Sequence, residues 1–542
     1  MSAPEGRVVH CDSVGSHNWG LTDGATLVGC LGPLSSAQAG RLGQRLAVRE
    51  HPGDADPAVP WAAGVRRVDG SILLATSTLW APGIFWSTTP EGRLTWGADL
   101  GAVVGAHAAT ALNEQWITDR LTLTPDALGG DVTPYLGVHR IPPGCSVLIN
   151  RSGTAKELTS WSSSDWPDVG SLAGTPAVAE FRGAFRSAVL RMADCAGQQG
   201  PIVLSLSGGL DSTYLAAVLL EAGYPVHGLV SSPLPGAPLL SAPGRVADDL
   251  PWAHLLARRY PDLLGIEPVR NYALRAPLDA AADLSSRAWW PCLSADNSVW
   301  MEQVRGRAAA LGATALFIGS HGNWSFSPEF ASPRRHSLTI RMRRRAAAKL
   351  RFWSSSPNRR RTVGKSRDLF LHGLARRGAS FDPLESPAAL GNDIWIADPY
   401  ADRQVLDVSA RIATSQWQCQ PGPRGFARLV AEGLVPDPIR LRRSRGAQAP
   451  DAWAWIKGQR AMYESRIDAL EGTPIIPDVV DVPRLRDDLL AWHWGTDQAP
   501  RMADQIAAHR VLAMADFIRI TTDRLASMRT SPMQGADRKS AR

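Results

Sequence analysis

The sequence has little of what marks membrane or secreted proteins. Its 542 residues contain no run of about twenty apolar residues, the length that a helix needs to cross a bilayer. The N-terminal residues 1–7 show neither the basic start nor the apolar stretch of a signal peptide. We therefore expect a cytoplasmic protein that has no membrane span.

Two common kinds of site are also missing. The six cysteines lie far apart without a C-x-x-C pair, which argues against a zinc site and a disulfide framework. A kinase-type phosphate loop needs G-x-x-x-x-G-K-[ST] after a strand. The only Gly-Lys-Ser, at 364–366, has Arg359 in place of the first glycine and no apolar run before it. The sequence therefore excludes a kinase-type phosphate loop.

A different glycine-rich turn is present, S-G-G-L-D-S-T at residues 207–213. The apolar run before it predicts a short buried strand, and the Ala/Leu-rich run after it predicts a helix. A helix that starts at such a turn offers free N–H groups and the positive end of its dipole to an anion. Ser207, Ser212 and Thr213 add hydroxyl donors, and Asp211 is placed to hold magnesium on bound phosphates. The turn therefore predicts an enzyme that splits ATP into AMP and pyrophosphate.

This turn and the segments after it resemble the pyrophosphate-loop ATP pyrophosphatases, in their asparagine synthetase-like branch. The supporting segments lie at 226–231, 248–253, 315–323, 398–402 and 436–446. They follow the order of that family, from about residue 180 to about residue 460. The resemblance implies an α/β fold whose residues 166–528 form a parallel-sheet synthetase domain of the adenine nucleotide alpha hydrolase type. Its cofactors are expected to be ATP and Mg²⁺.

The same resemblance assigns residues to the nucleotide and to the metal. Magnesium is expected on Asp211 and Asn323. The residues expected to bind ATP and pyrophosphate are Ser205, Ser207, Gly208, Gly209, Leu210, Asp211, Ser212, Thr213, Val230, Ser231, Gly319 and Ser320.

Residues 1–165 carry short apolar runs broken by glycine and proline, which predicts a β-rich layered domain. The turn I-P-P-G at 141–144 resembles the end of the glutaminase domain, of the Ntn type, in asparagine synthetases. Such glutaminases use a cysteine directly after the start methionine. Here Ser2 holds that place, and Cys11 would serve only after trimming of the first ten residues. We predict a degenerate domain that makes no ammonia, so that the amine comes with the substrate.

Two branches of the family use an amine of the substrate itself, the β-lactam synthetases and the lasso-peptide macrolactam synthetases, or lasso cyclases. Asn323 stands where β-lactam synthetases place a second magnesium carboxylate, and G-N-x-[ST]-x-S at 322–327 is similar to lasso cyclases. Asn323 after a glycine also fits a plain turn residue. We predict a lasso cyclase that joins the N-terminal amine of a leader-cleaved peptide to an Asp or Glu side chain. A β-lactam or other small-molecule amide synthetase is the alternative.

The sequence differs from these families at a second position, that of their catalytic lysine. Counted from Pro436 without gaps, Ser444 occupies the lysine position, between Arg443 and Arg445. Arginine, whose pKa exceeds about 12, supplies positive charge but no proton. We expect Arg443 and Arg445 to act with Asp211 in catalysis by stabilising the charge of the adenylate transition state. Asp451 offers an alternative, a structural ion pair with these arginines.

The chain has twenty tryptophans against seven tyrosines. Large aromatic faces suit a pocket that holds a folded peptide, because proximity lowers the entropy cost of ring closure. We assign Trp289, Trp290 and His321 to the substrate. The other tryptophans are expected in the core or at its rim.

The net charge of +7 comes from one segment, because residues 334–367 hold thirteen Lys or Arg and no Asp or Glu. This basic insert, at 333–368, fits a solvated excursion, a docking surface for an acidic partner or a nucleic-acid contact. The basic insert has no known base-recognition motif and no aromatic surface on which bases could stack, so we expect no nucleic-acid partner. The expected partners are the lasso precursor peptide, its leader peptidase and a leader-recognition protein. Residues 529–542 are expected to form a disordered tail.

Overall fold

A computed structural model gives the fold. It describes residues 9–10, 19–20, 26–31, 36–48, 60–77, 84–89, 94–107, 110–122, 131–159, 169–239, 244–328, 383, 394–419 and 424–530. Ser2, Cys11 and the basic insert at 333–368 lie outside the described residues. The last helix, α20 (Met502–Thr530), includes the first two residues of the predicted tail, so the boundary predicted at residue 528 was two residues early. The remaining tail residues also lie outside the described part.

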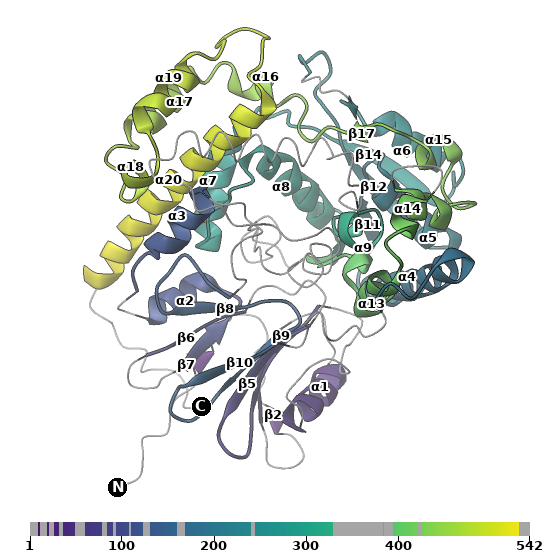
Figure 1. The fold of residues 1–542 in the computed structure, drawn as a ribbon, viewed down its shortest axis with the longest axis horizontal. Coiled ribbons are helices and arrows are strands. Elements are labelled where there is room, and N and C mark those ends of the chain that lie inside the picture. Colours follow the sequence, from purple (N-terminus) through teal and green to yellow (C-terminus); the bar gives the residue numbers. More distant parts are fainter. Residues whose placement is uncertain are drawn as a thin grey trace.

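Two largely antiparallel sheets form the N-terminal part, below the other elements in Figure 1. The four-stranded sheet has the order β1 (Val9–His10), β7 (Leu94–Gly97), β6 (Ile84–Thr88) and β8 (Val138–Ile141). Within it, β1 and β7 run parallel. The six-stranded sheet has the order β10 (Ala155–Thr159), β9 (Cys145–Ile149), β5 (Ile72–Thr76), β4 (Ala62–Arg66), β3 (Thr26–Leu31) and β2 (Trp19–Gly20).

The two sheets pack face to face through apolar side chains that point inward from both. Trp96 is fully buried there, and a Cβ on Gly64 would come within 2.5 Å of its ring, so residue 64 must lack a side chain. The outer face of the six-stranded sheet packs on α1 (Ser36–Val48). The outer face of the four-stranded sheet packs on α2 (Leu100–Ala106) and α3 (Glu114–Thr122). The expected β-rich, layered arrangement of the N-terminal part is confirmed.

A five-stranded, all-parallel sheet forms the second part. Its order is β14 (Leu264–Val269), β12 (Val226–Ser231), β11 (Ile202–Ser205), β15 (Ala315–Phe317) and β16 (Trp395–Ala397). One face packs on α4 (Gly174–Gly197), α5 (Leu210–Glu221), α6 (Leu250–Ala257) and α13 (Arg403–Arg411). The other face packs on α8 (Ala295–Ala310). The expectation of an α/β fold with a C-terminal parallel sheet is thus confirmed.

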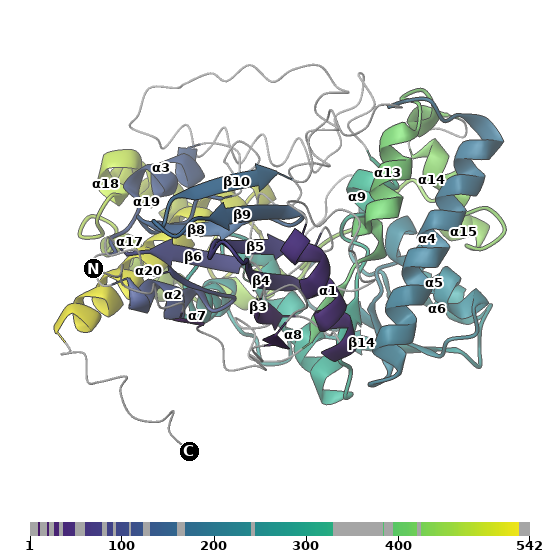
Figure 2. The ribbon, with the colours of Figure 1, turned by 90° about the horizontal axis from the view of Figure 1, so that it is seen from below.

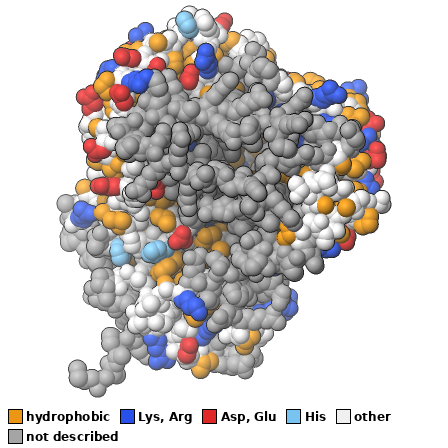
Figure 3. All heavy atoms as spheres, viewed as in Figure 1, with side chains coloured by type: hydrophobic (Ala, Val, Ile, Leu, Met, Phe, Trp, Pro, Cys, Tyr) orange, Lys and Arg blue, Asp and Glu red, His pale blue; other side chains and the backbone are white. Residues whose placement is uncertain are grey.

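Helices from the end of the chain join the two parts. Side chains of α2 and α3 share one apolar cluster with α7, α8, α20 and the helices between residues 452 and 490. The long α20 runs along this junction in both views (Figures 1 and 2). The further helices are α7 (Pro277–Ala288), α16 (Ala452–Ile456), α17 (Arg460–Asp468), α18 (Ile476–Val479) and α19 (Val482–Leu490). Acidic and basic side chains are interspersed over α17, α18 and α19 (Figure 3).

Short elements complete the described chain. They are α9 (Gly322–Ser325), α14 (Gly425–Val430), α15 (Asp437–Arg440), β13 (Arg245–Val246), β17 (Arg445–Gly446) and the 3-10 turns η6 (Pro399–Ala401) and η7 (Gln416–Gln418). Among the described helices, none combines the length and the apolar character needed to cross a bilayer.

Candidate functional site

The glycine-rich turn lies where the order of the parallel sheet changes direction. From the central strand β11 the chain builds outward to β12 and β14, then returns to add β15 on the other side of β11. Ligands of open α/β sheets bind outside the carboxyl ends of the strands at such a point. The turn follows β11 there, and Gly319 follows β15. A Cβ on Gly319 would come within 3.0 Å of the Ser212 backbone nitrogen, so the two loops touch.

Hydroxyl groups of the turn hold its own backbone. Ser212 Oγ donates to the Ser207 carbonyl at 2.7 Å and accepts from the Ser207 N–H at 3.1 Å. Thr213 Oγ1 donates to the Gly209 carbonyl at 2.7 Å. Both side chains are buried, whereas Ser207 is exposed. Ser212 and Thr213 therefore shape the loop, and Ser207 is the hydroxyl at its surface.

Helix α5 begins earlier than the sequence predicted. Gly209 is its N-cap, with extended dihedral angles and no side-chain cap, and Leu210 to Thr213 are already helical. The first N–H groups of α5 therefore lie inside the motif itself. An uncapped N-terminus of this kind presents donors and positive dipole charge to an anion.

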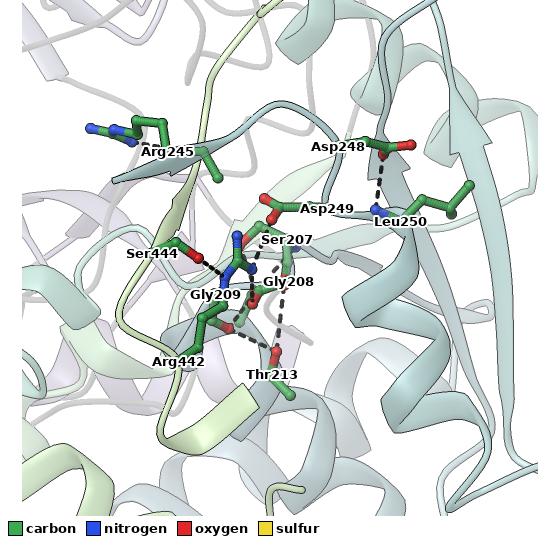
Figure 4. Close-up of polar contacts among 12 residues, drawn as sticks. Ser207, Gly208, Gly209, Thr213, Arg245, Asp248, Asp249, Leu250, Arg442 and Ser444 are labelled. Atoms are coloured by element: carbon green, nitrogen blue, oxygen red, sulfur yellow. Dashed lines mark hydrogen bonds and ion pairs between the residues drawn. The ribbon is translucent and has the colours of Figure 1, made fainter. Parts of the chain in front are cut away.

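Arg442 fastens the segment 436–446 onto the loop (Figure 4). Its Nη1 donates to the Gly208 carbonyl at 2.8 Å and to Asp249 Oδ1 at 3.0 Å, and its guanidinium lies 4.4 Å from the centre of the Trp252 ring. Its Nε donates to Ser444 Oγ at 2.9 Å, so Ser444, which was predicted to replace a catalytic lysine, supports this arginine. A Cβ on Gly208 would approach Trp252 Cβ to 2.4 Å, which explains a glycine at that position.

A two-stranded parallel ribbon, β13 with β17, continues this contact. Its register pairs Arg245 with Arg445, and Arg245 Nη1 donates to the Gly446 carbonyl at 2.6 Å. A Cβ on Gly446 would come within 1.9 Å of Asp249 Oδ2, so the ribbon lies directly on that carboxylate. Burial raises the pKa of Asp249, and the charge and hydrogen bond of Arg442 oppose the rise.

Asp211 lies in the first turn of α5 with contacts from three other segments. Ser327 Oγ donates to its Oδ1 at 2.6 Å, and Arg424 Nη1 lies 3.7 Å from its Oδ2. Tyr400 donates its hydroxyl to the Asp211 backbone carbonyl at 2.8 Å. Gly322 packs against the carboxylate, because a Cβ there would come within 2.7 Å of Oδ1. The structure therefore brings the segments at 315–323, 398–402 and 424–430 to the loop.

The two predicted catalytic arginines differ in surroundings. Arg445 is half-buried, and burial lowers its pKa to about 10. The negative charge of Asp211 opposes this decrease, and the positive charge of Arg245 adds to it. Arg443 is exposed, and its charge contributes to the lowered pKa of Arg428, which burial mainly causes. Arg445 is thus the one whose charge acts on the loop carboxylate. Asp451 does not pair with either in the described contacts; it accepts the Leu234 N–H at 2.8 Å.

The other predicted residues divide between the loop and the core. Ser205 and Ser231 end β11 and β12 at the carboxyl edge of the sheet, where the register pairs Ser205 with Leu229 and not with Ser231. Leu210 and Val230 are core side chains that can offer only backbone groups. Gly319 and Ser320 lie on the facing loop, and Ser320 is exposed.

His321 and Asn323 continue this loop into α9. The ring Nδ1 and the backbone N–H of His321 both contact Asp398 Oδ2, at 2.5 and 3.0 Å. Asn323 is exposed and donates to the Ser320 carbonyl at 3.3 Å.

Asp211 and Asn323 would give a magnesium ion few protein ligands. Across the described parts of the chain, no three His, Cys, Asp or Glu side chains form a metal cluster. Mg²⁺ is commonly held by one or two carboxylates together with substrate phosphates. Asp211 would be the protein carboxylate for a magnesium ion that arrives with a nucleotide, and Asn323 directly follows Gly322, which packs against that carboxylate.

The structure places Trp289 and Trp290 at the junction of the two parts. Trp290 is 3% exposed and packs edge-on against Trp116, with ring centres 5.2 Å apart. Trp289 ends α7 in the left-handed region, accepts the Tyr135 hydroxyl on its carbonyl at 2.8 Å and packs on Gly101. These contacts give both residues a packing role and do not bring them to the glycine-rich loop.

Two residues of the site escaped sequence reasoning. Arg424 precedes α14 with a φ of 61°, and no motif surrounds it. Arg245 lies beside a predicted segment but outside it. The one available signal was their charge, which the many other arginines of the chain share.

Comparison with protein-family models finds no match for this chain, and neither does comparison with curated proteins.

Proposed function

We propose that this chain is an AMP-forming, ATP-dependent amide ligase, and that its reaction closes a macrolactam in a leader-cleaved peptide. One observation carries the proposal. The Ser207–Thr213 loop lies at the switch point of a parallel sheet, with Asp211, Arg442 and Arg445 around it. An uncapped helix start surrounded by arginines favours phosphate binding.

In the proposed first step, a carboxylate oxygen of an Asp or Glu of the peptide bonds to the α-phosphorus of ATP. The bond to the bridging oxygen breaks, and pyrophosphate leaves. Negative charge builds on the phosphate oxygens, and the N–H groups at the start of α5 and the guanidinium of Arg445 are placed to stabilise it. A magnesium ion on Asp211 would neutralise part of the same charge.

In the proposed second step, the N-terminal amine of the peptide bonds to the acyl carbon. The acyl–phosphate bond breaks, AMP leaves, and the amine releases its proton. The peptide loses one water in total. The partly buried Arg445 keeps its charge throughout, because its pKa of about 10 lies well above neutral pH. Its role is therefore electrostatic.

The direct test combines the purified chain with ATP, magnesium, a candidate precursor peptide and its leader peptidase. Loss of one water from the core peptide, with AMP and pyrophosphate in equal amounts, supports the proposal. The Asp211→Asn variant serves as the negative control. AMP formed with small amino acids but without peptide would move the chain to the small-molecule amide synthetases. Absence of AMP with every carboxylate substrate would refute the ligase.

A further inference from the structure

A cavity opens between the end of α19, the loop that follows this helix and the start of α20. Its volume is about 320 Å³, within the range of about 300–1,000 Å³ that small-molecule sites have. Helix α19 lies on the left of Figures 1 and 2, whereas α5, which starts at the glycine-rich loop, lies on the right. The cavity is therefore separate from the site described above.

Apolar side chains form part of the cavity lining. Leu489 and Ala508 are buried and belong to the apolar cluster that joins the two parts of the chain. Trp492 is half-buried, and its neighbours hold its ring in place. The ring stacks on Trp494, with ring centres 5.6 Å apart, and meets Trp453 edge-on at 6.1 Å. A fixed aromatic wall of this kind suits an apolar side chain of a ligand.

Two side chains of opposite charge also line the cavity. Arg501 precedes α20, and Asp504 lies in its first turn. The Asp504 N–H donates to the Arg501 carbonyl at 2.9 Å, so the two residues are neighbours along the backbone. Within the described part of the chain, however, neither side chain forms an ion pair or a hydrogen bond, with the other or with any further residue. Both charged groups border the cavity without a protein partner.

The same sequence spacing gives ion pairs elsewhere in the chain. Asp437 and Arg440 pair at 2.7 Å, and Asp516 pairs with Arg519. At the start of α20 the guanidinium and the carboxylate instead stay apart on one cavity wall. A ligand that carries both charges close together would satisfy both groups at once through charge-assisted hydrogen bonds.

Two more ionisable side chains, Asp488 and His493, line the cavity. Asp488 already interacts with another residue of the protein, so we assign the cationic group of the ligand to Asp504. His493 is exposed, and neither charge of the ligand requires it.

From this cavity we infer a binding site for a free α-amino acid with an apolar side chain. The carboxylate of the amino acid pairs with Arg501 and its ammonium group with Asp504, while its side chain packs on Trp492. In a peptide the terminal ammonium and carboxylate groups stand at opposite ends of the chain. A free amino acid therefore fits the two charges better than a peptide does. The inference is independent of the proposed ligase, because none of these residues belongs to the ligase site.

Isothermal titration of the full chain tests the site with L-leucine, L-methionine, L-phenylalanine and L-tryptophan as probes. At least one of them should bind with a stoichiometry of one. The tightest probe is then compared with its analogues that lack the carboxylate or the ammonium group; for phenylalanine these are phenethylamine and 3-phenylpropionate. Each analogue should bind about tenfold or more weakly, the loss expected for one charged hydrogen bond.

Two variants remove the same interactions from the protein side. Arg501→Gln and Asp504→Asn should each weaken binding of the amino acid about tenfold or more. Arg501→Gln should not change the affinity for the analogue without a carboxylate, and Asp504→Asn should not change that for the analogue without an ammonium group. The control is Asp487→Asn, at an exposed aspartate of α19 that does not line the cavity. Circular dichroism shows whether each variant is folded.

The outcomes decide the inference in either direction. Losses of affinity that match between each analogue and its variant, with Asp487→Asn unchanged, support the site. Wild-type chain that binds none of the probes up to their solubility limits would overturn it. So would binding that persists unchanged in folded Arg501→Gln and Asp504→Asn, or analogues that bind as tightly as the amino acid. Formation of AMP takes no part in this test, so the ligase proposal stands or falls separately.

Discussion

Arg424 Nη1 faces Asp211 Oδ2 across 3.7 Å, and both side chains are only 13% exposed. This pair joins the first turn of α5 to the segment before α14, which are more than two hundred residues apart in the sequence. A magnesium nucleotide would place its metal at the same carboxylate. The partners of Asp211 therefore differ between the free and the nucleotide-bound enzyme in our proposal.

Asp211→Asn should lower the rate of AMP formation by about a hundredfold or more, similar to the loss of one catalytic charge-stabilising group. The amide oxygen can still accept the Ser327 hydroxyl, so the fold should remain. The rate is measured from AMP released with ATP, magnesium and peptide. Asp497→Asn, at an exposed pair with Lys457, is the control and should act like wild type. Full activity in Asp211→Asn would contradict the role of this carboxylate.

Gly208→Ala should both destabilise the chain and impair ATP binding. The added Cβ would lie 2.4 Å from Trp252 Cβ and 3.0 Å from Arg442 Nη1, so the loop or α6 must move. Overpacking of this kind costs about 1–3 kcal/mol of unfolding free energy. Urea denaturation gives this value, and calorimetric titration gives the ATP affinity.

Gly306→Ala is the matched control for that substitution. Gly306 lies in α8 and a Cβ there meets nothing within 4 Å. Alanine in an open helix interior should stabilise the chain by about 0.5–1 kcal/mol. Equal effects of the two substitutions would show that contact with Trp252 and Arg442 does not explain Gly208.

Much of the fold around the loop could be predicted from the sequence. Apolar runs between glycines indicated β11, β12 and β15, and the structure has them at Ile202–Ser205, Val226–Ser231 and Ala315–Phe317. These strands are buried on both faces, so they read as continuous apolar runs. The start of α5 was placed too late, because Gly209 caps the helix through its backbone alone and leaves no side-chain signal.

The sequence could not show which arginines belong to the site or whether Trp289 and Trp290 line a pocket or pack in the core. Arg424 and Arg245 reach Asp211 and Arg445 only after distant segments pack together. Likewise, the tryptophan pair at 289 and 290 looks the same in a pocket or in a core. Their burial depends on α2, α3 and α20, which all lie more than 150 residues away in the sequence.

Trp290→Ala should therefore cost about 3–5 kcal/mol of unfolding free energy, as expected for a large buried aromatic side chain. Trp290→Phe keeps most of the packing against Trp116 and should retain the wild-type KM for ATP and peptide. Denaturation curves and steady-state kinetics of both variants measure these values. A folded Trp290→Phe with a raised KM for the peptide alone would instead support the predicted substrate contact.

Asp296 anchors a buried polar chain in the C-terminal helices. It contacts His509 Nδ1 at 2.9 Å, and His509 Nε2 lies 2.6 Å from the Tyr463 hydroxyl. Burial would raise the pKa of Asp296, but the charge and hydrogen bond of His509, with a bond from Gln505, lower it below its usual value. A carboxyl group whose pKa is lower in the folded state stabilises the fold above its unfolded pKa of about 3.9.

Asp296→Asn should thus lower the unfolding free energy by about 1–3 kcal/mol at pH 7, the range for a hydrogen bond to a charged group. The difference in unfolding free energy between wild type and variant should shrink as the pH falls below about 4 and then below the lowered pKa of Asp296. At such pH the wild-type carboxyl group is protonated and, like the amide of the variant, carries no charge. Urea denaturation at several pH values measures it. A difference that stays constant down to pH 2 would contradict an ionised Asp296 in the folded chain.

Arg445→Lys should keep more activity than Arg445→Ala, because the charge beside Asp211 is what we expect to stabilise the transition state. Burial lowers the pKa of Arg445 to about 10, and a lysine there starts from about 10.4 and falls further. The alkaline limb of the kcat profile should therefore move to lower pH in Arg445→Lys. Arg443→Ala, at the exposed neighbour, is the control and should change kcat little. Equal losses in Arg445→Lys and Arg445→Ala would show that the shape of the guanidinium and not its charge is required.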